Sequence, residues 1–336
     1  MDWYPLFLTP CLKEYLWGGT RLLTDFGVPA KGPTAAEAWV LSCHKDGPSV
    51  VGNGPLAGRT LTEALAEWGP GALGRRAAGF PYFPLLIKLI DAKDRLSVQV
   101  HPDDAYAARV EGEYGKTEMW YVVDCEPGAR LIYGVNCGLT KGEFRRHIEE
   151  DSLPEICNQV PVHPGDVFFI PAGTLHAIGA GILIAEVQQN SNTTYRVSDY
   201  GRLGPDGKPR ALHVDKAVDV TVTVPPQIPY GAVGRVSPVP GGSVRPLASC
   251  GLFTAELLTV EGQMRVGCSE SFTALLCLEG EGALLWEDGE LPIGKGTSIF
   301  LPAGMAVPVK GSLRLLCSRV KRRARDADAA CCINRA

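Results

Sequence analysis

Short apolar runs separated by turn-forming residues recur along this chain. Residues 85–90, 120–123, 167–170 and 182–184 are dominated by aliphatic and aromatic side chains and lie next to Gly, Pro or Asp. Runs of this length and composition predict β-strands. Many short strands punctuated in this way favour an all-β barrel or sandwich. We therefore expect a mainly β protein.

Helical patterns are few. Thr60 to Glu63 has the sequence of a capping box, and Gly69-Pro70 would end the helix that it starts. Thr140 to Glu143 repeats the box before a second short amphipathic run at 144–150. These two helices are too few to alternate with the strands, so they predict excursions between strands.

The segment 225–242 is the best candidate for a domain boundary. It is rich in proline and glycine and has little hydrophobic periodicity, and strand-like patterns resume from Phe253 to about Val320. We therefore expect a first domain at 1–224, a linker at 225–242, a second domain at 243–320 and a tail at 321–336.

An internal repeat links the two predicted domains. Residues 165–173 and 296–304 both read as a strand that runs into a Pro-Ala-Gly turn. Counted onward from each first glycine, His176 in the first copy corresponds to Val307 in the second. The pattern predicts two related β halves, of which only the first keeps a histidine and the second is structural.

Composition and charge exclude several classes of function. The 336 residues include 33 basic and 37 acidic side chains and give a net charge of −4, which offers no footprint for nucleic acid or an anionic membrane. No apolar run reaches the roughly 18 residues of a membrane span, and the start lacks the pattern of a signal peptide. We expect a cytoplasmic protein, and a monomer by default.

Cysteine usage agrees with a reducing compartment. The 11 cysteines form no C-x-x-C pair and no disulfide framework, and the adjacent Cys331 and Cys332 fall in the predicted tail. Most of the others are expected to be small buried apolar residues.

Four residues could together bind a divalent metal. Gln99 and His101 lie two positions apart in the run 96–102, so strand alternation places them on one face. Glu118 opens the next strand, and His176 follows the Pro-Ala-Gly turn. Two imidazoles, a carboxylate and an amide oxygen suit zinc and tolerate manganese, iron or cobalt. A set without thiolates is typical of a catalytic site.

The alternative for each residue is structural. Taken singly, a histidine, glutamine or glutamate on a strand is usually a hydrogen-bonded core or surface residue, and spacing alone does not decide between the two. No partner pattern surrounds His44, His147, His163 or His213, and we assign these four no function.

Three blocks of sequence at these residues resemble the short bacterial form of the type I mannose-6-phosphate isomerases. They are residues 83–104, 115–120 and 169–178. A fourth block, 186–196, matches in Glu186, in Arg196 and in the ten-residue step between them. The resemblance extends from about Trp17 into the second predicted half.

This resemblance implies a fold, a cofactor and a reaction. It implies two cupin-like (jelly-roll) β-barrel halves, one Zn²⁺ per chain bound by Gln99, His101, Glu118 and His176, and interconversion of mannose 6-phosphate and fructose 6-phosphate. The chain departs from the long form of the family by lacking its large helical insertion and by differing at 197–202. Contacts to the substrate phosphate therefore transfer poorly.

Three residues are candidates for the chemistry. Glu186 and Lys116 could move protons in a cis-enediol mechanism, in which zinc would polarise the substrate oxygens. The alternatives are a carboxylate that orients a ligand histidine and a snorkelling surface lysine. Arg196 could stabilise an enediolate or a phosphate, or could instead form an ion pair with Asp199 or a nearby acid.

Four further residues could contribute to the site. Arg202 is a weaker candidate for binding phosphate. Trp17, Glu37 and Trp39 resemble family positions near the barrel mouth, although buried packing would explain both tryptophans equally well.

Two other functions remain open from the residues alone. Cupins with similar ligands include iron or manganese dioxygenases, because a fold does not determine its chemistry. A non-enzymatic regulator that binds a sugar phosphate could also keep the metal site, and ligand would then stabilise it without turnover.

Overall fold

The computed structural model describes residues 3–30, 32–204, 207–287 and 289–321. The predicted tail lies outside the described residues except for Lys321, and so do Cys331 and Cys332. The chain divides into two compact units. Unit 1 comprises the residues up to Lys13, Thr20–Leu89 and those from Ala232 onward, and unit 2 comprises Glu14–Gly19 and Ile90–Gly231.

This division cuts across the predicted first domain. The change at Gly231 falls within the predicted linker, but unit 1 also takes in Thr20–Leu89. The reason is a long-range strand pairing, in which Leu6 lies opposite Phe300 and so joins the first strand to the C-terminal sheet. The domain limits 1–224 and 243–320 stay a prediction.

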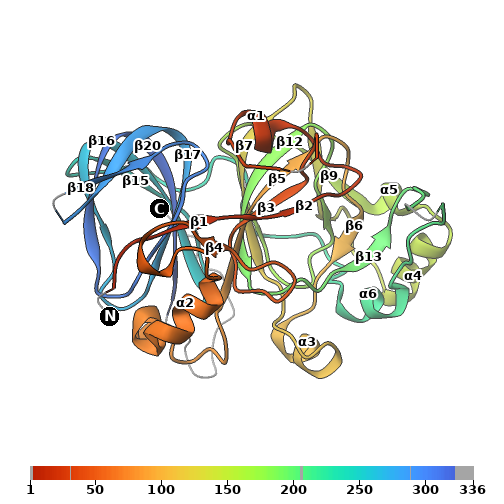
Figure 1. The fold of residues 1–336 in the computed structure, drawn as a ribbon. Helices are drawn as coiled ribbons and strands as arrows, with labels where there is room; N and C mark the ends of the chain where they lie inside the picture. The colour runs from red at the N-terminus through yellow and green to blue at the C-terminus, as the bar shows by residue number, and fades with distance from the viewer. Residues whose placement is uncertain (1–2, 31, 205–206, 288, 322–336) are drawn as a thin grey trace. The chain divides into compact units, whose positions relative to one another are not determined.

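Unit 1 contains one nine-stranded sheet with the order β14-β15-β16-β20-β17-β19-β1-β4, and β18 pairs with β17. In Figure 1, β16, β17 and β20 run side by side. The strands of this unit are β1 (Leu6–Thr9), β2 (Cys11–Lys13), β3 (Glu37–Leu41), β4 (Val50–Val51), β14 (Ser237–Val239), β15 (Gly242–Ser249), β16 (Phe253–Gly267), β17 (Thr273–Trp286), β18 (Gly289–Ile293), β19 (Ser298–Leu301) and β20 (Ala306–Val320). Its helices are α1 (Arg21–Thr24) and α2 (Leu61–Trp68).

The core cluster between the long strands of unit 1 is apolar. Alternate residues of β16 and β20, such as Val260 opposite Leu313 and Val266 opposite Val307, project to one face and are buried. They pack with side chains of β17 and β19, including Leu275. Because strand residues alternate between faces, this pattern fills the space on one side of the long strands with hydrocarbon.

Unit 2 contains two groups of strands. In one, β7 lies between β10 and β12; the other has the order β13-β6-β11-β8-β9. The strands are β6 (Val98–Val100), β7 (Glu118–Cys125), β8 (Arg130–Val135), β9 (Cys157–Pro161), β10 (Val167–Ile170), β11 (His176–Ala177), β12 (Ile182–Gln189) and β13 (Tyr195–Ser198). The helices are α3 (Asp104–Val110), α4 (Lys141–Glu149), α5 (Leu153–Ile156) and α6 (Val214–Val220). Strand β5 (Leu85–Ala92) spans the change from unit 1 to unit 2.

Both predicted capping boxes are confirmed. Thr60 and Glu63 exchange side-chain and backbone hydrogen bonds at the start of α2, and Thr140 and Glu143 do the same at α4. The apolar face of α4 is buried through Phe144, which belongs to the same core cluster as β6 and β13. The short helices therefore cover the outer face of the five-stranded sheet.

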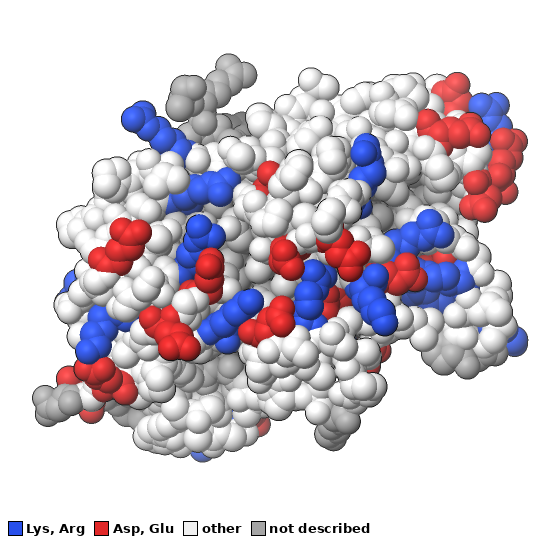
Figure 2. Space-filling view, turned by 90° about the horizontal axis from the view of Figure 1, so that it is seen from above, with Lys and Arg blue, Asp and Glu red and all other residues white. Residues whose placement is uncertain are grey.

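The architecture confirms a mainly β fold with a few short helices. Among the described residues, strand pairing closes neither the nine-stranded nor the five-stranded sheet into a barrel. No helix in the described ranges is both long and apolar enough to span a bilayer. Figure 2 shows basic and acidic side chains interspersed on the face drawn there, in agreement with the nearly balanced charge.

Candidate metal centre

A row of side chains crosses the five-stranded sheet of unit 2. His176 of β11 lies opposite Gln99 of β6 on one side and Tyr133 of β8 on the other, and Arg196 of β13 lies opposite Gln99. Directly opposed residues of antiparallel strands share a face of the sheet. The register therefore brings two of the predicted ligands and one candidate catalytic residue onto the same face.

His101 and Glu118 reach the same point from other segments. Gly173 of the Pro-Ala-Gly turn donates its backbone N–H to the His101 carbonyl, and Glu118 of β7 lies opposite Ile170 of β10. His101, Glu118 and His176 are all buried, and their potential ligand atoms lie within 4.8 Å of one another. The structure thus assembles three of the four predicted ligands from β7, β11 and the residue that follows β6.

The spacing of these atoms fits a tetrahedral metal. The His176 Nε2 atom is 3.1 Å from His101 Nε2 and 3.3 Å from Glu118 Oε1, and His101 Nε2 is 3.5 Å from Glu118 Oε2. Bonds of about 2.0–2.1 Å to zinc imply ligand-to-ligand distances of about 3.3 Å in a tetrahedron. Each of the three contacts is close to this spacing, with Glu118 presenting Oε1 to His176 and Oε2 to His101.

The Gln99 amide lies beside His176. Its Nε2 atom is 3.3 Å from His176 Nε2. Rotation of the amide by 180° exchanges its nitrogen and oxygen, and this would present the oxygen to a cation at the same place. The donor set is then two imidazoles, one carboxylate and one amide, which fits the predicted ion.

Backbone carbonyls orient both imidazoles. The Nδ1 atom of His101 is 3.0 Å from the Thr193 oxygen, and that of His176 is 2.8 Å from the Thr174 oxygen. A carbonyl accepts only from a protonated Nδ1, so each Nε2 keeps its lone pair for a metal. Burial, aided by the Lys116 charge, lowers the pKa of His176 to about 3, so this imidazole is neutral at pH 7.

Lys116 lies inside the ligand cluster. Its Nζ atom is 2.8 Å from Glu118 Oε2 and 2.9 Å from His101 Nε2, and its side chain is buried. The ammonium therefore contacts the carboxylate directly, within reach of any group bound at the metal position. This environment differs from the alternative of a snorkelling surface lysine.

Glu186 approaches the cluster through Trp120. The two residues are opposed in β12 and β7, and the Trp120 indole N–H donates to Glu186 Oε2 over 2.8 Å. The same indole packs edge-on against the His176 ring, with 5.3 Å between centroids. Glu186 is buried. Sequence analysis missed Trp120, although its position two residues after Glu118 places it on the inward face of β7.

Arg196 and Arg202 have different surroundings. Arg196, half-buried beside Gln99, donates from Nη1 to the Ala211 oxygen over 2.9 Å. Asp199 instead accepts from Arg202 and Arg210 at 2.6–2.7 Å. Burial, followed by the Arg210 charge, lowers the pKa of Arg196. The Asp199 carboxylate, which was the expected alternative partner of Arg196, is thus bound by Arg202 and Arg210.

The aromatic residues singled out in the sequence are buried. In unit 2, the Trp17 ring lies 5.4 Å from the Tyr15 ring. In unit 1, the Trp39 indole N–H donates to Glu37 over 2.7 Å, and Lys88 Nζ lies 3.6 Å from the same carboxylate. The buried Lys88 was not anticipated, because a single lysine in an apolar run carries no signal of its role.

Comparison with known proteins gives consistent results. The model of the type I phosphomannose isomerase catalytic domain matches residues 6–123, and that of the mannose-6-phosphate isomerase cupin domain matches residues 246–320. Mannose-6-phosphate isomerase ManA of Bacillus subtilis is 40% identical over 90% of this chain and 94% of that protein. The mannose-6-phosphate isomerase of Streptococcus mutans is 38% identical over 89% of this chain and 92% of that protein.

Solved structures agree with the sequence comparison. The crystal structure of the mannose 6-phosphate isomerase from Bacillus subtilis matches with a TM-score of 0.86 at 38% identity, covering 94% of this chain and 99% of that chain. Together with the cupin-domain match, this confirms the cupin-like fold expected from the sequence.

Proposed function

The chain belongs to the type I phosphomannose isomerase family, and from this premise we propose that it interconverts mannose 6-phosphate and fructose 6-phosphate with one bound Zn²⁺. Its reaction class is that of an aldose–ketose isomerase. The observation that carries the zinc assignment is the convergence of the buried His101, Glu118 and His176 side chains, whose donor atoms approach one another to 3.1–3.5 Å.

We assign the metal to Gln99, His101, Glu118 and His176. When bound, the ion would act as a Lewis acid that polarises the oxygens on C1 and C2 of the sugar. The mixed nitrogen and oxygen ligands favour zinc and also accept manganese, iron or cobalt.

Glu186 is our candidate for moving the proton between C1 and C2. A carboxylate suits this step because one residue can remove the proton from one carbon of a cis-enediol and return it to the other. The indole N–H of Trp120 fixes Glu186 Oε2 and so orients the carboxylate. This role is supported by the burial of Glu186 and by its position beside the ligand cluster.

Lys116 and Arg196 would interact with oxygen atoms of the substrate and would not take part in the proton transfer between C1 and C2. The Lys116 ammonium, 2.8 Å from Glu118, can donate a proton or a hydrogen bond to an oxygen bound at the metal position. Arg196 carries a permanent charge on the same sheet face as Gln99, where it can stabilise an enediolate or the substrate phosphate.

A cytoplasmic location and a monomeric state complete the proposal. The partner is a small hexose phosphate. Size-exclusion chromatography with light scattering tests the monomeric state, because a dimer would have a measured molar mass of twice the 36.0 kDa of the chain.

The deciding experiment measures fructose 6-phosphate formation from mannose 6-phosphate before chelation, after chelation and after zinc is restored. We expect chelation to abolish turnover and zinc to restore it. Iron-dependent oxygen consumption without fructose 6-phosphate formation would favour an oxygenase. A fully metallated protein that is stabilised by the sugar phosphate but never turns it over would refute the isomerase and favour the regulator.

A further inference from the structure

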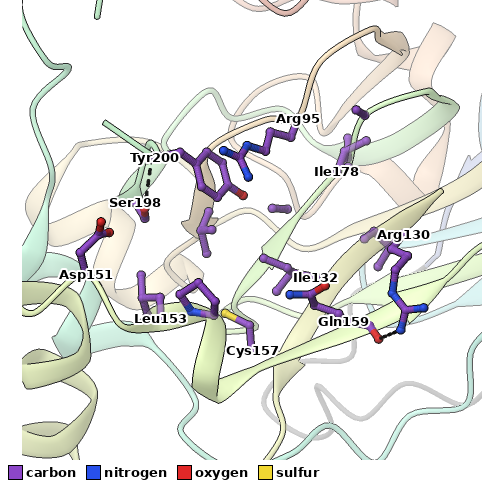
Figure 3. Close-up of a pocket in the computed structure, with 16 residues that line it drawn as sticks. Arg95, Arg130, Ile132, Asp151, Leu153, Cys157, Gln159, Ile178, Ser198 and Tyr200 are labelled. Atoms are coloured by element: carbon purple, nitrogen blue, oxygen red, sulfur yellow. Dashed lines mark hydrogen bonds between the residues drawn. The ribbon is translucent and has the colours of Figure 1, made fainter. Parts of the chain in front are cut away.

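A cavity of about 500 Å³ lies in unit 2, away from the metal ligands. Figure 3 shows its lining. The cavity is built from strands of the five-stranded sheet together with the segment at α5 and the loop at 178–180. Its size is within the range of pockets that take small organic molecules.

The cavity faces the reverse side of the sheet that carries the metal ligands. Val98 and Ala177 line it, and each is adjacent in sequence to a predicted ligand, Gln99 or His176. Ser198, which lies opposite Val98, lines it too. Neighbouring strand residues project to opposite faces, so a molecule in this cavity would be separated from the metal by one layer of backbone.

The floor of the cavity is apolar, and its rim has an excess of positive charge. Val98, Leu131, Leu153 and Ile178 are buried hydrocarbon. The charged side chains of the lining are Arg95, Arg130 and Asp151. Two guanidinium groups against one carboxylate favour an anion over a cation at the rim.

Arg95 is held in position for such a contact. Its guanidinium carbon lies 3.7 Å from the centroid of the Tyr200 ring, and Figure 3 shows the two side chains together at one side of the cavity. A stacked guanidinium keeps its in-plane N–H groups available for a carboxylate or phosphate. Arg130 lies on the other side of the cavity, where its Nη2 donates to the Gln159 oxygen over 2.8 Å.

Tyr200 is placed in the lining at a conformational cost. Its φ of 57° is in the left-handed region, which costs a non-glycine residue about 1 kcal/mol or more. Its backbone N–H donates to Ser198 Oγ over 3.3 Å, and the Arg202 guanidinium carbon lies 5.7 Å from the centroid of its ring. Burial raises the pKa of Tyr200 to about 12, so the phenol remains a hydrogen-bond donor. The surroundings thus hold the Tyr200 backbone in an unfavourable conformation in which its phenol lines the cavity.

We propose that this cavity is a second ligand site, which binds a small organic anion by pairing its acidic group with Arg95 and Tyr200 and burying its apolar body against the sheet. The acidic group is a phosphate or a carboxylate. The volume exceeds what inorganic phosphate needs, and the apolar floor provides no partners for a fully hydroxylated sugar. The ligand class therefore differs from the hexose phosphate of the proposed reaction.

The test is calorimetric titration of the metallated full-length protein with phenyl phosphate and, separately, with benzoate. Each titration is run with and without saturating fructose 6-phosphate. We expect one molecule of at least one of the two probes to bind in both conditions, and the preferred probe identifies the acidic group. Neutral benzyl alcohol should bind at least about tenfold more weakly, because it lacks the charge-assisted hydrogen bonds.

Two variants and one matched control test where the probe binds. Arg95→Ala should weaken binding by about tenfold or more. Arg109→Ala is the matched control, because Arg109 also stacks on a tyrosine, 5.3 Å from the Tyr106 ring, but does not line the cavity. A third variant, Ala180→Trp, would fill the rim without removing a charge and should also abolish binding.

Several outcomes would overturn the proposal. These are the absence of binding by both probes, equal binding of benzyl alcohol, displacement by fructose 6-phosphate, or unchanged affinity in both Arg95→Ala and Ala180→Trp. Thermal melts establish that each variant is folded. The measurement needs no turnover, so it stands or falls independently of the isomerase activity.

Discussion

The two units contain the same strand-and-turn segment, once with a metal-ligand candidate and once without. In β10 and its turn, Gly165 and Gly173 have φ angles of 92° and 86°. In β19 and its turn, Gly296 and Gly304 have φ angles of 90° and 85°. Positive φ at both glycines explains why the sequence repeats there, since other residues are strained in this conformation. The backbone of the repeat is therefore shared by both units.

The hydrogen bonds around the segment also correspond. Gly173 donates to the His101 oxygen over 2.8 Å, and Gly304 donates to the Cys268 oxygen over 2.9 Å. By this criterion, Cys268 of unit 1 corresponds to His101 of unit 2.

Strand register extends the correspondence to the other ligands. Gln99 lies opposite His176 in unit 2, and Val266 lies opposite Val307 in unit 1. The residue opposite the end of β10 is Glu118, and the residue opposite the end of β19 is Thr273.

The four ligand positions of unit 2 thus have unit 1 counterparts that offer no comparable donor set. Two of them, Val266 and Val307, belong to its hydrocarbon core. The same frame accommodates either a polar cluster or an apolar core, and we therefore expect function to depend on the inward-facing side chains and not on the fold alone.

The largest effect is expected when the histidine of unit 2 is replaced by the valine found at the corresponding position of unit 1. His176→Val should reduce metal affinity by more than about 100-fold, because even the partners of metal ligands are worth 10–100-fold. Isomerase activity should fall to background. Metal content by mass spectrometry and turnover measure both effects. An active His176→Val protein with a full complement of metal would contradict the ligand assignment.

The reverse exchange is the matched control. Val307→His places a polar ring in the core of unit 1 and should lower the free energy of unfolding by about 1–3 kcal/mol. It should add no second metal, since Val266 and Thr273 remain. Activity per folded molecule should be unchanged, as measured after correction for the folded fraction.

The second contrast concerns Glu186 and its counterpart Cys317. Glu186 lies opposite Trp120, and Cys317 lies opposite Leu275 at the equivalent point of unit 1. Glu186→Gln should lower kcat by about 10²–10⁴-fold with the metal retained, as expected for loss of a general base. Cys317→Ala should leave kcat unchanged. Comparable kcat values for Glu186→Gln and the parent would remove this residue from the proton-transfer step.

The third contrast is the tryptophan itself. Trp120→Phe keeps an aromatic ring beside His176 but removes the N–H that Glu186 accepts. Loss of a hydrogen bond to a charged group corresponds to about 1.5–3 kcal/mol, so kcat should fall by about 10–100-fold while zinc content and KM change little. A variant that changes only in thermal stability would show that Trp120 serves packing alone.

Local features of the fold could be predicted from the sequence. The run 167–170 coincides with β10, and both capping boxes begin helices as expected. These succeed because strand alternation and helix capping depend on residues a few positions apart. The proximity of His101, Glu118 and His176 was also expected, from the family resemblance together with strand alternation, and their role as ligands stays a prediction.

Long-range features could not be predicted. The pairing of Leu6 with Phe300 mixes the ends of the chain in unit 1, and no local pattern encodes it. The contact of Lys116 with His101 and the bond from Trp120 to Glu186 depend on how separate segments meet. The cavity behind the sheet required the positions of Arg95 and Tyr200, which are ordinary loop residues in the sequence.

The smallest expected effect tests a feature that the two units share. Thr60→Ala in unit 1 and Thr140→Ala in unit 2 each remove an N-cap, and each should lower the free energy of unfolding by about 1 kcal/mol. Thr→Ser at either position keeps the hydroxyl and is the control. The backbone N–H of each threonine, with its hydroxyl, lowers the pKa of Glu63 or Glu143 below 4.5, so the caps stabilise above that pH and weaken as pH falls through the lowered value. Denaturant melts at pH 7 and pH 3 should therefore show a larger effect of each alanine variant at pH 7, and equal losses at both pH values would contradict the role of the glutamates.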